Sequence, residues 1–159
     1  MSTPSTAELM SWLSGVDIAV ADAESCAAVL QGLSRLIAWA ESHKVAAAQR
    51  LAQLAAESPA IFPEHVVAEA TRVSLGRALE PFKRASAIEA FPRFGDALRS
   101  GDVSTAHVDV LAGALGKLDD RERESFVARG DFLGGVAQQA TPGEFARVVR
   151  AELLRCRRG

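Results

Sequence analysis

The sequence has few of the residues that build redox, metal or membrane sites. It contains only two cysteines among 159 residues, Cys26 and Cys156. Two distant thiols do not form a zinc site, and a domain of this size needs no disulfide. There is no run of about 18 apolar residues to span a membrane, and the start "MSTPSTAELMSW" lacks the features of a signal peptide. We therefore expect a cytoplasmic protein with reduced thiols and no membrane contact.

The sequence also lacks the alternating β-branched runs that are typical of strands. Apolar residues make up 48% of the chain, which argues against disorder. These features predict an all-α fold, formed as a single domain over residues 1–159. We expect a multi-helix bundle with one long helix in its N-terminal half and short helical hairpins after it.

The long helix follows a shorter one. Ser5 and Glu8 form a capping-box pattern that predicts a first helix over residues 5–21. From Asp22 onward no strong helix breaker occurs before Pro59, so we expect a helix of about 35 residues, about 50 Å long. This is longer than a compact domain of this size needs.

A stripe of mostly apolar residues with alternating spacings of three and four runs along this helix. The stripe consists of Leu30, Leu33, Ile37, Ala40, Lys44, Ala47, Leu51 and Leu54. Such a heptad pattern is typical of helices that pair along one seam. It allows two interpretations, a homodimer formed through the long helix or packing within one chain.

The segment "VAEATRVSLGRAL" has the outline of a helix-turn-helix, with Ser74 as the cap of its second helix. Arg72 replaces the usual turn glycine, and we expect Pro81 to kink or split the second helix. Short helical corners are also common in bundles that do not bind DNA. If this corner does contact DNA, the side chains that face it are Arg77, Lys83 and Arg84.

The last helix is the only strongly basic segment. Thr141 and Pro142 predict its start, as a capping-box residue followed by proline at the first helical position. Five arginines against Glu144 and Glu152 leave an excess of three positive charges: Arg147, Arg150, Arg155, Arg157 and Arg158. The net charge of the chain is −2, so charge as a whole does not indicate DNA. The basic segment is either a solvated helix end, favoured by the helix dipole, or a DNA contact.

One helical hairpin holds the most informative histidine. In "ALRSGDVSTAHVDVLAGAL", Gly101 is predicted to end one helix with a positive φ, and Ser104 to cap the next. The three histidines of the chain fall on different predicted helices and match no metal-binding spacing. We therefore interpret His107 as a hydrogen-bonding residue that fixes the hairpin. We expect no catalytic residue, no metal and no cofactor.

Two segments carry a resemblance to a known family. "FPRFGDALRSGDVSTAHVDVLAGALGKL" and "ATPGEFARVVRAELLR" resemble the actinobacterial 13E12 repeat family, also called domain-of-unknown-function family 222. The resemblance covers roughly residues 25–157. It implies an all-helical domain that usually precedes an HNH endonuclease domain, in which His and Asn side chains surround a divalent metal. This sequence contains no HNH motif, so no nuclease residue carries over to it.

The resulting functional expectation is a non-catalytic helical module that supports binding of DNA or of a partner, including a downstream nuclease domain. The alternative is a module for protein–protein dimerisation or regulation without any contact to nucleic acid. The salt dependence of the binding affinity distinguishes the two, because contacts to phosphate release counterions whereas contacts along an apolar seam do not.

Overall fold

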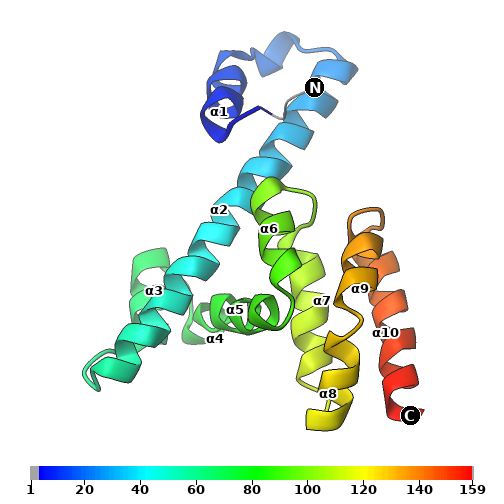
Figure 1. The fold of residues 1–159 in the computed structure, drawn as a ribbon. Helices are drawn as coiled ribbons and strands as arrows, with labels where there is room; N and C mark the ends of the chain where they lie inside the picture. Colours follow the sequence, from blue (N-terminus) through cyan, green and yellow to red (C-terminus); the bar gives the residue numbers. More distant parts are fainter. Residues whose placement is uncertain (1–3, 159) are drawn as a thin grey trace.

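The computed structural model describes residues 4–158, and every regular element in this range is helical (Figure 1). The predicted all-α fold is confirmed. The helices are α1 (Thr6–Gly15), η1 (Ile18–Val20), α2 (Ala23–Glu57), α3 (Pro63–Thr71), α4 (Leu75–Ala78), α5 (Glu80–Ala90), α6 (Pro92–Ser100), α7 (Thr105–Leu115), α8 (Asp120–Val127), α9 (Gly130–Ala137) and α10 (Pro142–Arg158). Among the described residues, no helix is both long enough and apolar enough to cross a bilayer.

Helix α2 is the predicted long helix. It has 35 residues, begins after Asp22, whose carboxylate accepts from the Ser25 amide, and ends before Ser58. Hydrogen bonds from Ser25, first from its side chain and then from its backbone amide, lower the pKa of Asp22. In Figure 1, α1 lies beside the first part of α2, α5 and α6 beside its middle, and α3 beside its end. The helix thus extends at both ends beyond the part that packs on α5 and α6, and its ends carry α1 and α3.

The hydrophobic core lies to one side of α2, between α5 and α10. Its largest fully buried side chains include Phe94, Phe126 and Phe145, with Leu98 and Leu111 around them. Helix α7 contacts both α5 and α10 and so runs through the centre of this core. By contrast, α1 and α3 contain no fully buried residue. Burial is therefore concentrated in the second half of the chain.

Several helix starts form as the sequence predicts. At α1 the Ser5 amide donates to Glu8 at 2.7 Å, and at α10 the Thr141 amide donates to Glu144 at 2.8 Å. These backbone hydrogen bonds lower the pKa of both glutamates, because they stabilise the ionised carboxylate. Helix α10 then begins at Pro142, as predicted.

The predicted first helix over residues 5–21 is too long. Helix α1 ends at Gly15, and Asp17 caps a separate 3-10 turn by accepting from the Ala19 amide at 3.1 Å. Glycine weakens a helix, and an aspartate that caps the following turn competes for the same backbone. A second break occurs at Arg129, where the glycine-rich segment divides into α8 and α9.

The turn after α6 brings two helices into close contact. Gly101 has φ 83°, in the left-handed region, and its amide reaches the carbonyl groups of Ala97 and Leu98. A Cβ at Gly101 would lie 3.1 Å from Cα of Arg35, in the middle of α2. The end of α6 therefore packs directly on the backbone of α2.

The apolar stripe of α2 is divided in the structure. Its later part faces α3, where Leu51 is half-buried and lines a small hollow with Val66. Its earlier part is exposed: Leu30, Leu33 and Ile37 are 65%, 40% and 62% accessible. We call these three residues the α2 stripe. Packing within the chain therefore accounts for only part of the heptad pattern.

Candidate functional site

The segment with the helix-turn-helix pattern does not contain a helix long enough to bind in a DNA groove. Arg72 ends α3 in the left-handed conformation with φ 56°, and the Ser74 hydroxyl caps α4 by accepting from Arg77 at 3.4 Å. Helix α4 has only four residues, because Pro81 occupies the first turn of a new helix, α5. The split at Pro81 is as predicted. A single turn is too short to present several side chains to base edges, as a recognition helix does.

The guanidinium of Arg84 is hydrogen-bonded to carboxylates on two other helices. Its guanidinium donates to both oxygens of Asp109, at 2.7 and 2.9 Å, and to Glu41 at 3.3 Å. The hydrogen bond to Asp109 is the main cause that raises the pKa of Arg84. The side chain is only 11% accessible. Arg84 therefore connects α5 to α7 and α2, and we do not include it in a DNA interface.

Arg77 and Lys83, the other two residues of the corner, are exposed. Each lies beside carboxylates: Arg77 lines a hollow of about 250 Å³ that also contains Glu41 and Glu80. Lys83 lines a second hollow, of about 510 Å³, together with Glu80 and Asp109. The corner thus carries both positive and negative side chains, and the carboxylates reduce its attraction for phosphate.

His107 is buried and both of its ring nitrogens are used. Nδ1 accepts from the Ser104 amide at 3.1 Å, and Nε2 lies 2.9 Å from the carbonyl oxygen of Ala140. A carbonyl can only accept and an amide can only donate, so the ring is neutral with its proton on Nε2. No ring nitrogen remains for a substrate. The bond from Ser104 lies within the hairpin of α6 and α7, and the bond to Ala140 links α7 to the turn before α10.

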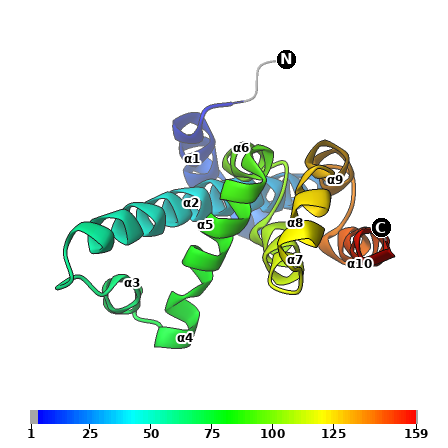
Figure 2. The ribbon, with the colours of Figure 1, turned by 60° about the horizontal axis from the view of Figure 1, so that its bottom comes forward.

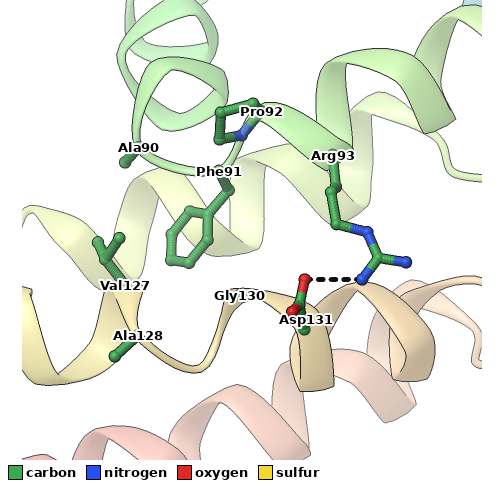
Figure 3. A pocket seen from close by; sticks show the side chains of 8 residues that line it. All are labelled: Ala90, Phe91, Pro92, Arg93, Val127, Ala128, Gly130 and Asp131. Carbon is green, nitrogen blue, oxygen red and sulfur yellow. Dashed lines mark hydrogen bonds and ion pairs between the residues drawn. The ribbon is translucent and has the colours of Figure 1, made fainter.

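One small pocket lies where the α5–α6 corner meets the junction of α8 and α9. Figure 3 shows Phe91 lying beside Val127, with Arg93 and Asp131 joined at the rim. Its volume is about 230 Å³, and the distance between Arg93 and Asp131 is 2.8 Å. The lining contains no histidine, cysteine or serine. The pocket thus offers one exposed ion pair and no hydroxyl, thiol or imidazole group.

Metal binding has no support in the described part of the chain. Within residues 4–158, no group of three His, Cys, Asp or Glu side chains is placed to hold a metal ion. Cys26 and Cys156 are both free thiols, on α2 and α10.

Helix α10 has one buried and one basic face. Phe145, Val149 and Leu153 are buried, while all five arginines of the helix are exposed. Arg155 pairs with Glu152 at 3.0 Å, and Arg157 donates to the carbonyl oxygen of Lys117 at 3.2 Å.

The remaining arginines of α10 share its solvent side. Arg147, Arg150 and Arg158 project opposite the buried residues, because their spacings of three and eight keep them within one sector of a helix. None of the three is in an ion pair with another residue of the described range 4–158. We call these three residues the α10 basic face.

The match to a family is specific and nearly complete. The family model described as "Domain of unknown function (DUF222)" matches residues 19–156. The chain belongs to the DUF222 family. Comparison with curated proteins and with solved structures gave no match. The DUF222 match extends from η1 into the last turn of α10, so it includes the His107 hairpin and two residues of the α10 basic face, Arg147 and Arg150, and stops before Arg158.

The two groups of candidate DNA-binding residues in this DUF222 domain lie apart. Arg77 and Lys83 belong to α4 and α5, on one side of α7, and α10 lies on the other side (Figure 2). The predicted residues therefore do not form a single surface. The α10 basic face gathers three exposed arginines on one helix, of which Arg147 lies near the Glu144 carboxylate and helps to lower its pKa.

Proposed function

We propose that this DUF222 domain is a non-catalytic helical module that binds the phosphate backbone of DNA with its α10 basic face. The observation that supports this proposal is the placement of Arg147, Arg150 and Arg158. All three are exposed on one side of one helix, and none is in an ion pair within the described range. Arginine is well suited to phosphate, because its planar guanidinium donates two parallel hydrogen bonds.

The dimensions of the face fit a DNA backbone. Arg147 and Arg158 are eleven residues apart, which corresponds to about 16 Å along an α-helix. Such a length spans several phosphates of one strand, which are about 3.4 Å apart along the helix axis. Contacts of this kind position a protein on DNA without reading its sequence. The domain would then hold DNA for a nuclease domain, in keeping with the resemblance to helical domains that precede HNH nucleases, and work in the cytoplasm.

Binding of duplex DNA tests the proposal. We expect fluorescence anisotropy with a labelled mixed-sequence duplex to show weak binding whose affinity falls with salt. For three phosphate contacts, the slope of log K against log salt concentration should be about −3. The triple variant Arg147→Ala, Arg150→Ala, Arg158→Ala should lose about tenfold or more in affinity at low salt, because each neutralised phosphate releases counterions.

The matched control removes three positive charges elsewhere, with Lys44→Ala, Arg50→Ala and Arg99→Ala on α2 and α6. It should change the affinity by less than about twofold, since these side chains do not share a face with α10. An equal loss in both triple variants would mean that net charge alone causes binding. Absence of binding at low salt would reject the DNA proposal.

A protein-binding module without nucleic-acid contact is the second candidate. It is favoured by exposed large apolar side chains that concentrate in the first half of the chain, including Met10, Trp12, Ile18 and Val20 on and after α1. Surface patches of this kind commonly mark sites of protein contact. Such binding should change little between low and moderate salt.

A further inference from the structure

The α2 stripe is an apolar helix face that the rest of the described chain leaves uncovered. Leu30 and Ile37 are each more than 60% accessible, and Leu33 is 40% accessible. The three lie within two turns on one side of α2, because their spacings are three and four. Single exposed apolar residues are common on proteins, but a contiguous row of them indicates an interaction surface.

Neighbouring helices frame the stripe without covering it. Helix α1 packs on an adjacent side of α2, where Gly32 lies against Leu9 and Trp12. Helix α3 lies against the continuation of the same side, where Leu51 is half-buried while Lys44 and Ala47 are still exposed. The open part of the face is therefore the segment from residue 30 to residue 40.

This segment is complementary to itself. Its residues 30, 33, 37 and 40 are spaced by three, four and three, a pattern that is symmetric about Arg35. If a second copy of α2 lies antiparallel across it, Leu33 meets Ile37 of the second copy and Leu30 meets Ala40 of the second copy. Each contact then occurs twice, as a two-fold axis requires. The small side chain of Ala40 leaves room for the leucine that faces it.

The charges near the stripe leave room for a second copy, and the length of the open segment limits how strong the pairing can be. Arg35, the one charged residue between positions 30 and 40, lies on the side of α2 that packs against Gly101, and Lys44 at the edge of the stripe pairs with Glu41 at 3.0 Å. Ten residues of helix give a seam only about 15 Å long. Because α3 lies against the end of this face, the two helices must cross rather than run alongside each other for their whole length. The area is thus that of a weak interface, below a standard stable one.

We propose that two copies of this chain pair through the α2 stripe, about a two-fold axis near Arg35. The pairing brings Leu30, Leu33 and Ile37 of each copy out of water. It is independent of the proposed DNA contact, which uses the opposite part of the domain.

Sedimentation equilibrium of the full chain tests this pairing. We expect the average mass to rise from 16.8 kDa towards twice that value with concentration. Because small interfaces are commonly weak, we expect a dissociation constant on the order of tens of micromolar. Ile37→Asp should abolish the rise while circular dichroism remains unchanged, since Ile37 is 62% accessible in the single chain. Leu154→Asp, at a site on α10 that is 53% accessible, is the matched control and should still dimerise.

A pair of opposite charges tests the register. Leu33→Lys and Ile37→Asp should each give monomers, whereas an equimolar mixture of the two variants should dimerise again, because the new charges face each other. A wild-type chain that remains monomeric at about 200 µM would overturn the proposal, since tens-of-micromolar affinity leaves mostly dimer there. Dimerisation that survives Ile37→Asp, or a mixture that remains monomeric, would overturn the α2 pairing as well.

Discussion

Replacement of His107 with leucine is expected to lower the free energy of unfolding by about 2–4 kcal/mol, because two backbone groups lose their partners. In the wild type, Nδ1 accepts from the Ser104 amide and Nε2 donates to the carbonyl oxygen of Ala140. Leucine fills much of the same volume next to Phe145 but offers neither a donor nor an acceptor. Urea unfolding followed by circular dichroism measures the loss.

A second variant separates the two hydrogen bonds. His107→Gln places a side-chain oxygen at the third position of α7, where glutamine commonly accepts from the capping residue's amide. It should therefore retain the bond from Ser104, lose the bond to Ala140, and cost about half as much as leucine. If the leucine variant is as stable as the wild type, these bonds contribute nothing, and the connection between α7 and α10 depends on packing alone.

Gly101→Val should destabilise the domain by about 2–4 kcal/mol, for two independent reasons. Valine is β-branched and strained at φ 83°, the angle that Gly101 adopts. Its Cβ would also lie 2.9 Å from Cγ and 3.1 Å from Cα of Arg35. A long side chain can move aside, but the backbone of α2 cannot do so without displacing the helix.

Gly113→Ala is the matched control for Gly101→Val. Gly113 lies inside α7 with a normal helical φ, and a Cβ there meets no atom within 4 Å. Alanine should stabilise α7 by up to about 1 kcal/mol, through higher helix propensity. Thermal melts of both variants measure the contrast. If Gly101→Val has the same melting temperature as the wild type, α6 and α2 can shift to accommodate the valine side chain, and the prediction is wrong.

Features that depend on neighbouring residues could be predicted from the sequence. The capping boxes at Ser5 and Thr141 formed because the donor and acceptor are three residues apart and need no distant partner. The split at Pro81 follows from the missing amide of proline in the same way. The buried side of α10 was also predictable, because its helical period fixes which residues lie opposite its arginines.

Features that depend on distant partners could not be predicted. Arg84 looked like a surface cation beside Lys83, yet its carboxylate partner Asp109 is 25 residues away. His107 bonds to Ala140, 33 residues away, so local spacing gave its structural role but not its partner. The heptad stripe of α2 was likewise ambiguous, since only the position of α3 decides which part of it is covered.

The uneven distribution of buried residues has a consequence for motion in solution. Helices α1 and α3 bury no residue fully, so either can detach from α2 without opening the core around Phe94 and Phe145. Their amides should therefore exchange with deuterium through low-energy local openings, whereas amides of α7 should exchange only when the whole domain unfolds. In hydrogen-exchange experiments we therefore expect slow exchange for amides of the core helices. We expect faster exchange for amides of α1 and α3, which detach transiently from the two ends of α2.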